Sequence, residues 1–217
     1  MSNLIVIGIS GRKRHGKDTV GAYLRDVHGF RPIAFADPVK QIGMEIYGLT
    51  WQQCYGAEVE KEALIPRWGR SARQILQHIG TEMGRGVHPD TWARYTMDLI
   101  GRAARGEPYL VRSDAEQRFV SGEPYAGPWV ITDVRFPNEA DAVRSIGGPV
   151  WKVVRPSMGV SQDMHASETS VDLILEDGTL TNDGSLEDLY NKVQSLLRGQ
   201  CPDLAWDEVR DLRFGVQ

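Results

Sequence analysis

The chain has 217 residues, of which 41% are hydrophobic and 25% charged, as is usual for a soluble globular protein with one sizeable core. Acidic residues outnumber basic ones by 29 to 25, so the net charge is −4 and the pI is about 5.8. This balance argues against binding to a nucleic-acid polymer, which requires a basic surface, but it leaves room for a local basic pocket.

The sequence also indicates the compartment. Cys54 and Cys201 are too few for a disulfide framework, which favours a reduced environment. No apolar run approaches the ~20 residues of a membrane-spanning helix, and the N-terminus lacks the basic region and cleavage site of a signal peptide. We therefore expect a cytoplasmic protein with no membrane partner.

In chain order, strands alternate with helices. The run 4–9 is continuous and rich in β-branched residues, which is typical of a strand buried on both faces. Helices are expected where a capping residue precedes an apolar period of 3.6. The predicted strands are 4–9, 32–36, 129–132, 150–154 and one within 171–176; the predicted helices are 17–24, 37–47 with Asp37 as N-cap, one from Ser71, one from Asp90, 137–146 and 186–198.

The remaining segments are less regular. The sequence predicts an irregular stretch over 49–68, a hairpin around 109–112 and 118–120, and a short helix in the tail 200–217. Alternating strands and helices imply crossover connections and a parallel sheet with helices on both faces. We expect a three-layer α/β/α fold with five parallel strands in a single domain over 1–217.

The most specific motif is Gly11-Arg-Lys-Arg-His-Gly16-Lys17-Asp18-Thr19, directly after the first strand and at the start of a helix. A G-x-x-x-x-G-K-[ST] loop works because its backbone N–H groups turn inward around phosphate oxygens, beside the positive end of a helix. Lys17 would reach the β- and γ-phosphates. Asp18 stands where Ser or Thr normally contacts Mg²⁺, and a carboxylate can hold that ion directly or through water. The position of the motif predicts a nucleoside-triphosphate loop.

Other classes of phosphate-loop protein fit less well. A regulatory GTPase needs N-K-x-D to read guanine, and Asn191-Lys192-Val193-Gln194 lacks the aspartate. Kinases of small metabolites fit the length. Asp133 and Arg135 come directly after a predicted strand, and their spacing of two predicts that both side chains project to the same side of the sheet. There Asp133 would order Mg²⁺, and Arg135 would bind phosphate. The alternative interpretation is a surface ion pair.

Several motifs in this order resemble the phage deoxynucleoside monophosphate kinases, over about residues 4–197. They are the loop with its Lys-Asp-Thr ending, Phe35-Ala-Asp-Pro38, Gln77-His-Ile-Gly-Thr-Glu82, Asp133-Val-Arg-Phe-Pro-Asn-Glu139 and His165-x-Ser-Glu168. The resemblance implies the adenylate-type kinase fold, with an acceptor-binding region over 37–128 and a lid over 155–170. Residues 108–128 and 200–217 look like additions.

The resemblance also implies site residues. Arg155 would clamp the donor nucleotide, and Asn182 would abut the adenine ring unless it only forms a turn before Ser185. Asp37 would orient the acceptor or the metal, or cap its helix. The residues expected at the donor are Gly11, Lys13, Arg14, His15, Gly16, Lys17, Asp18, Thr19, Arg155 and Asn182; those expected at the acceptor are Asp37, Arg73, Gln77, Glu82, Arg85, Trp92, Arg135, Glu139 and Glu168.

We therefore expect Mg²⁺-dependent transfer of the γ-phosphoryl group of ATP to a deoxynucleoside 5′-monophosphate, with Lys17, Asp18, Asp133 and Arg135 as catalytic residues and Asp18 and Asp133 at the metal. The expected partners are these small molecules, and the resemblance suggests a homodimer. Two alternatives stay open: a kinase for another small acceptor such as dephospho-coenzyme A, and a non-catalytic nucleotide-binding module. We expect the lid to be open in the free protein and to close on both ligands.

Overall fold

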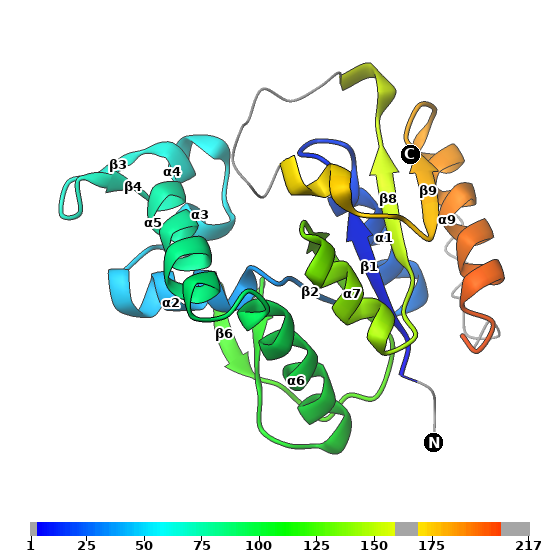
Figure 1. Ribbon diagram of the computed structural model, residues 1–217, viewed down its shortest axis with the longest axis horizontal. Helices are drawn as coiled ribbons and strands as arrows, with labels where there is room; N and C mark the ends of the chain where they lie inside the picture. Colours follow the sequence, from blue (N-terminus) through cyan, green and yellow to red (C-terminus); the bar gives the residue numbers. More distant parts are fainter. Residues whose placement is uncertain (1–3, 159–168, 205–217) are drawn as a thin grey trace. The chain divides into compact units, whose positions relative to one another are not determined.

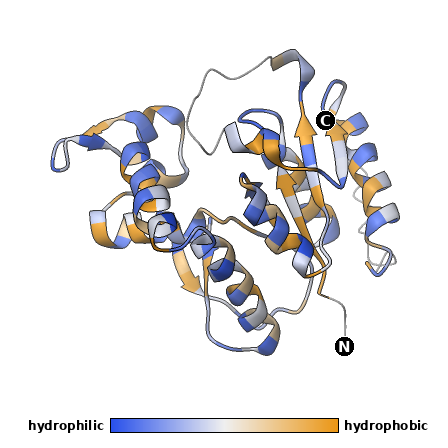
Figure 2. Cartoon of the chain, viewed as in Figure 1, coloured by the Kyte–Doolittle hydropathy of each residue, from blue (hydrophilic) through white to orange (hydrophobic). Residues whose placement is uncertain are grey.

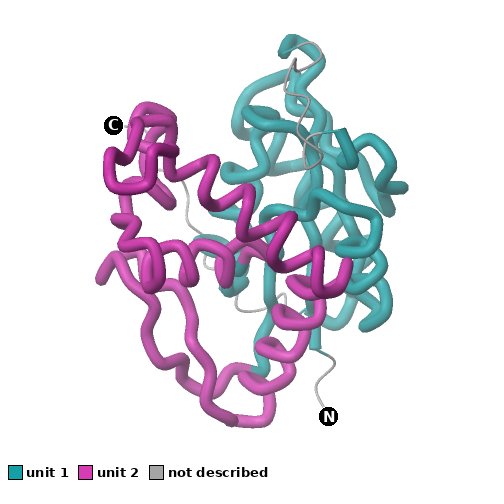
Figure 3. Tube along the Cα trace, turned by 60° about the vertical axis from the view of Figure 1, so that its left-hand side comes forward, with its two compact units in different colours: residues 1–33, 126–217 teal, residues 34–125 magenta. Residues whose placement is uncertain are grey.

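The computed structural model describes residues 4–158 and 169–204, and it divides the chain into two compact units. Unit 1 comprises residues 1–33 and 126–217, and unit 2 comprises residues 34–125 (Figure 3). Unit 2 is thus a continuous segment that leaves unit 1 after the second strand of the chain. In the described residues, no helix has the length and apolar character needed to cross a membrane.

Unit 1 is built on a five-stranded sheet in the order β2-β7-β1-β8-β9 (Figure 1). Every neighbouring pair is parallel, which confirms the predicted sheet. Its strands are β1 (Val6–Ser10), β2 (Arg31–Ile33), β7 (Trp129–Val134), β8 (Val150–Val154) and β9 (Gly178–Thr181).

Side chains of β1 alternate between two helical layers. Ile7 and Ile9 are buried in a core with residues of α1 and α9. A Cβ on Gly8, between them, would meet Val143 of α7 at 3.3 Å, so α7 covers the other face. The central strands β1 and β8 are mainly hydrophobic, as expected for a sheet covered on both sides (Figure 2). The helical segments of unit 1 are α1 (Lys17–His28), α7 (Pro137–Ser145), α9 (Leu186–Gln200) and the 3₁₀ turns η2 (Pro156–Met158) and η3 (Ser170–Leu173).

The position of the fifth strand differs from the prediction. The sequence placed it within 171–176, but the strand is β9, Gly178–Thr181, and η3 occupies Ser170–Leu173. Leu173 and Leu175 are 69% and 81% exposed, so the apolar run that suggested a strand is not buried in the sheet. Leu180 is the one buried hydrophobic residue of this edge strand, so the strand has no hydrophobic pattern by which the sequence would reveal it.

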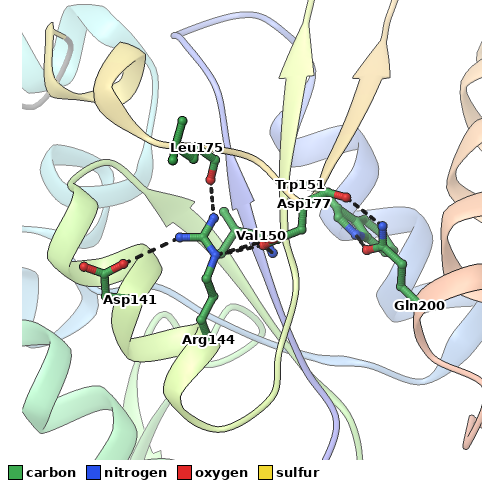
Figure 4. Close-up of polar contacts among 7 residues, drawn as sticks. All are labelled: Asp141, Arg144, Val150, Trp151, Leu175, Asp177 and Gln200. Carbon is green, nitrogen blue, oxygen red and sulfur yellow. Dashed lines mark hydrogen bonds and ion pairs between the residues drawn. The ribbon is translucent and has the colours of Figure 1, made fainter.

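A polar network joins elements at the amino edge of the sheet, where β8 begins and the chain leads into β9 (Figure 4). Arg144 of α7 contacts Asp177 at 3.0 Å and Asp141 at 3.6 Å, and it donates to the carbonyl oxygen of Leu175. Asp177 accepts from the backbone N–H of Val150 at 2.8 Å. Because this network ties α7 to both strand entries, we assign it to stability.

Unit 2 is mainly helical. The stretch 49–68, predicted as irregular, contains two short helices and one strand of a small hairpin. The hairpin predicted near 109–120 is confirmed, and so is the helix predicted from Ser71, which begins with a capping box in which Ser71 and Gln74 each bind the other's backbone. The elements are α2 (Asp37–Tyr47), α3 (Trp51–Tyr55), α4 (Glu58–Glu62), β3 (Leu64–Ile65), β4 (Arg70–Ser71), α5 (Ala72–His78), the π-helical segment η1 (Ile79–Arg85), α6 (Thr91–Arg105), β5 (Leu110–Ser113) and β6 (Arg118–Ser121).

Candidate active site

The carboxyl edge of the sheet in unit 1 brings together segments that are distant in the sequence. Because the strands are parallel, the ends of β1, β7, β8 and β9 lie at one edge. The residues that follow them are the loop 11–16, Arg135, Arg155 and Asn182. Four predicted site segments therefore share this edge.

The loop has the strand–loop–helix context that the sequence predicted, between β1 and α1. Gly11 has φ of 137° and Gly16 has φ of 110°, a region that side chains rarely adopt. A Cβ at Gly11 would lie 2.5 Å from the carbonyl oxygen of Val153, so a larger residue would displace backbone. Both glycines are thus required by geometry.

Lys17 begins α1 and is only 8% exposed. Its Nζ donates to the carbonyl oxygen of Arg12 at 2.9 Å, so the ammonium lies across its own loop. An ammonium group held in this way is close to the backbone groups that would surround a phosphate.

Other charged residues of the loop are more exposed. Arg12 forms an ion pair with Asp172 of η3, and this hydrogen bond lowers the pKa of Asp172. Lys13 is half-buried, Arg14 is exposed with a positive φ of 65°, and Asp18 is exposed in the first turn of α1, where Thr19 follows it. The loop therefore concentrates positive charge in a chain that is acidic overall.

The predicted pair Asp133 and Arg135 lies at the end of β7. The register between β1 and β7 shifts here, from Gly8 opposite Ile131 to Ser10 opposite Val134. β7 thus has one extra residue, and strict alternation stops. The spacing argument assumes regular alternation, which this bulge interrupts, so a common side for the two side chains stays a prediction. Both residues still lie at the carboxyl edge.

Glu139 and Arg155 make well-defined contacts near this edge. Glu139 is 3% exposed, and its Oε2 accepts from the backbone N–H groups of Arg135 at 2.8 Å and Phe136 at 3.1 Å. Arg155 is exposed, and its backbone N–H donates to Nδ1 of His15 at 3.3 Å. Glu168 and most of the predicted lid, residues 159–168, lie outside the described residues, as do residues 205–217 of the predicted tail helix.

In unit 2, Asp37 is the centre of a buried polar cluster. The helix begins at Asp37 itself, with Ala36 at the N-cap position, so the predicted cap is wrong by one residue. Its carboxylate accepts from the backbone N–H of Ala34 at 2.9 Å and from the hydroxyl of Tyr55 at 2.8 Å, and it lies 3.5 Å from Arg112. Burial and the neighbouring Asp37 raise the pKa of Tyr55, which therefore remains a donor.

The other predicted acceptor residues of unit 2 belong to α5, η1 and α6. Arg73 forms ion pairs with Glu58 and Glu62 of α4. Trp92 is 8% exposed, and its indole N–H donates to the carbonyl oxygen of Gly80 at 2.8 Å, so the ring packs inside unit 2. The remaining three lie on one continuous helical stretch: Gln77, Glu82 and Arg85, of which Glu82 is exposed.

Sequence reasoning missed several residues that hold these sites together. Arg112 comes from the hairpin that looked like an addition, and Tyr55 from the stretch that looked irregular. Asp172 and Lys192 support the edge of unit 1. Each contact joins residues far apart in the chain, except for Lys192 and Thr181, and a single sequence contains no periodic signal for such pairs.

Comparisons with known proteins identify the family. The family model described as deoxynucleotide monophosphate kinase matches residues 67–193. A relative from Acanthamoeba polyphaga mimivirus that bears the same family name is 34% identical over 194 residues, which cover 88% of this chain and 95% of the relative. The chain belongs to the deoxynucleotide monophosphate kinase family. It is therefore a member of a phosphotransferase family, as the resemblance implied.

Other similarities are more partial. The deoxynucleotide monophosphate kinase of Enterobacteria phage T4 is 38% identical over 128 residues, which cover 59% of this chain and 46% of the phage protein. Among solved structures, shikimate kinase from Aquifex aeolicus matches with a TM-score of 0.46 at 12% identity, covering 91% of this chain and 98% of that chain. A structural similarity at this level carries no argument about substrates.

Proposed function

We propose that this family member transfers the γ-phosphoryl group of ATP to a deoxynucleoside 5′-monophosphate, giving the diphosphate. The observation that carries the proposal is the loop of unit 1, with Lys17 buried at the start of α1 and held across it by the carbonyl oxygen of Arg12. Family membership supports the acceptor class.

The proposed reaction needs positioning and charge neutralisation more than acid–base chemistry. The acceptor phosphate has a second pKa of about 6, so it is largely ionised near neutral pH and requires no general base. Lys17 would exchange its carbonyl acceptor for phosphate oxygens, while Arg135 and Arg155 would place positive charge beside the transferred group. The small partners are thus ATP and the deoxynucleotide. The expected homodimer stays a prediction.

A divalent cation fits the residues at this edge. Mg²⁺ prefers oxygen ligands and keeps several waters, and Asp18 and Asp133 offer carboxylates. No group of three or more His, Cys, Asp or Glu side chains in residues 4–158 and 169–204 could hold a metal alone, so phosphate oxygens and water would complete the coordination. When bound, the ion would neutralise charge on the phosphates.

The test is turnover by Lys17→Ala with radiolabelled ATP and a panel of deoxynucleoside and ribonucleoside monophosphates. Loss of one electrostatic group aimed at the transition state costs about 10²–10³-fold in kcat, and we expect at least this loss. Lys61→Ala, in α4 of unit 2, is the matched control and should retain turnover. Circular dichroism checks the fold of both.

Three outcomes would contradict the proposal. Retained turnover in Lys17→Ala would remove the loop from the reaction. Wild-type protein that forms product only with an acceptor other than a deoxynucleotide, such as dephospho-coenzyme A, would overturn the assigned substrate. Binding of ATP without acceptor-dependent release of ADP would instead favour a non-catalytic module.

A further inference from the structure

Asn182 contacts the phosphate loop directly. It follows β9, and its side-chain Nδ2 donates to the carbonyl oxygen of His15 at 3.0 Å. The two residues are 167 positions apart in the chain. The contact therefore connects the end of the edge strand to the part of the loop that directly precedes α1.

Asn182 is itself fixed from two directions. Its backbone N–H donates to the carbonyl oxygen of Val154 at 2.7 Å, which extends the pairing of β9 with β8. Lys192 of α9 donates to the carbonyl oxygen of Thr181 and to the carboxylate of Asp183, each at 2.7 Å. The residues on both sides of Asn182 are thus tied to α9, so the backbone from which the amide projects is held in place.

A fixed carbonyl at His15 determines the direction of the next N–H. The peptide bonds described include no cis bond, so the C=O of His15 and the N–H of Gly16 point in opposite directions within one planar group. Since Asn182 holds the C=O, the N–H of Gly16 points away from β9. In a phosphate loop, the binding groups are backbone N–H groups that turn inward.

The packing at Gly16 shows how close this contact is. A Cβ at Gly16 would lie 2.6 Å from Nδ2 of Asn182, so no side chain fits between the loop and the amide. His15 is 8% exposed and is held on its ring side as well, where Nδ1 accepts from the N–H of Arg155. The ends of β8 and β9 therefore form a wall that supports the loop backbone.

We propose that Asn182 is a positioning residue that sets the orientation of the His15–Gly16 peptide for phosphate binding. The sequence suggested a contact with the adenine ring, which stays a prediction; in the structure the amide nitrogen donates to the loop. The inference rests on the proposed use of this loop for the phosphates of ATP. The inference predicts that Asn182 contributes to the affinity of the loop for phosphate groups, and that this contribution is the same for every nucleotide base.

The test distinguishes an effect on phosphate binding from an effect on base binding by comparing ligands with and without a base. Asn182→Leu removes the donor at similar size without adding charge, and Asn182→Asp removes it with the shape retained. Calorimetry measures binding of magnesium tripolyphosphate, which has no base, and of ATP and GTP. We expect about tenfold weaker binding of tripolyphosphate and of ATP, which corresponds to about 1.4 kcal/mol. The ratio of ATP to GTP affinity should stay at its wild-type value.

Matched controls use the same substitutions at Asn191, an exposed residue of α9. Asn191→Leu and Asn191→Asp should bind tripolyphosphate as the wild type does. Thermal melting separates loss of fold from loss of orientation: a variant that melts like the wild type yet binds tripolyphosphate weakly supports the positioning role. If Asn182→Asp fails to fold, Asn182→Leu alone decides the question.

Three results have different consequences. Wild-type tripolyphosphate binding in folded Asn182→Leu, with a changed ratio of ATP to GTP, would overturn the inference and restore the base contact. A wild-type protein that does not bind tripolyphosphate would overturn both the inference and the use of the loop. Tripolyphosphate binding that depends on Asn182, in a protein that phosphorylates no deoxynucleotide, would support the inference and contradict only the proposed function.

Discussion

Glu139 gives a quantitative prediction, because the sequence places it at the acceptor while the structure shows it at the start of α7. Its Oε2 accepts from two backbone N–H groups, those of Arg135 and Phe136, in a position that is 3% exposed. If this contact is its main role, Glu139→Gln should lower stability without a selective effect on acceptor binding.

The magnitude follows from the two hydrogen bonds. A bond to a charged group contributes about 1.5–3 kcal/mol and a neutral one about 0.5–1.5 kcal/mol, so the neutral amide loses about 1 kcal/mol at each. The loss of about 2 kcal/mol in the free energy of unfolding should lower Tm by about 6 °C for a protein of this size. Glu139→Ala leaves both N–H groups without this acceptor and should cost about 4 kcal/mol.

Thermal and urea denaturation measure the loss, and steady-state kinetics measure KM for the deoxynucleotide. Asp188→Asn is the control: Asp188 makes a similar capping contact to the backbone of Ser185, but it is exposed, so its loss should be smaller. Glu139→Gln that melts like the wild type but raises the acceptor KM would refute this reasoning. It would place Glu139 at the substrate, as the sequence predicts.

Three further predictions concern stability and reactivity. Gly84→Ala should destabilise unit 2 by about 2–3 kcal/mol, because its Cβ would lie 2.0 Å from the ring of Trp92, whereas Gly86→Ala meets nothing within 4 Å and should be neutral in urea denaturation. Arg144→Met should lower the melting temperature and leave tripolyphosphate binding unchanged; weakened binding would show that the amino-edge network also supports the loop. Burial raises the pKa of Cys54 to about 11, so iodoacetamide at pH 8 should alkylate it slowly until urea unfolds the chain, and equal rates in both states would contradict its buried position.

The sequence predicted the parts of the fold that local patterns determine. The continuous run ending at Ile9, the glycines at 11 and 16 and the capping residue Ser185 each carry a signal within a few residues, and each is where it was expected. Strand alternation with helices then fixed the parallel sheet, because crossover connections leave few other arrangements. The position of the loop at the carboxyl edge follows from these two facts.

The parts that were missed depend on contacts across the chain. Leu173 and Leu175 imitate a strand because nothing local shows that they are exposed. The bulge in β7 interrupts the regular pleating that the spacing argument assumes at Asp133. The amide of Asn182 has no periodicity to reveal its partner, so the same residue suggested a base contact in the sequence and a contact with the loop in the structure.

The two edges of the sheet in unit 1 differ in a way that suits a phosphate site. At the amino edge, Arg144 contacts two carboxylates and a backbone carbonyl, and these contacts connect α7 to the strands. At the carboxyl edge, the ammonium of Lys17 is held by a neutral carbonyl, and the exposed Asp172 is the counter-ion of Arg12. A bound phosphate can replace a carbonyl or an exposed carboxylate at low cost, because solvent screens an exposed ion pair. The carbonyl oxygen of Arg12 and the carboxylate of Asp172 are thus acceptors that a polyphosphate can replace, and the backbone that receives the ligand is held by Asn182, whose contact the ligand need not break.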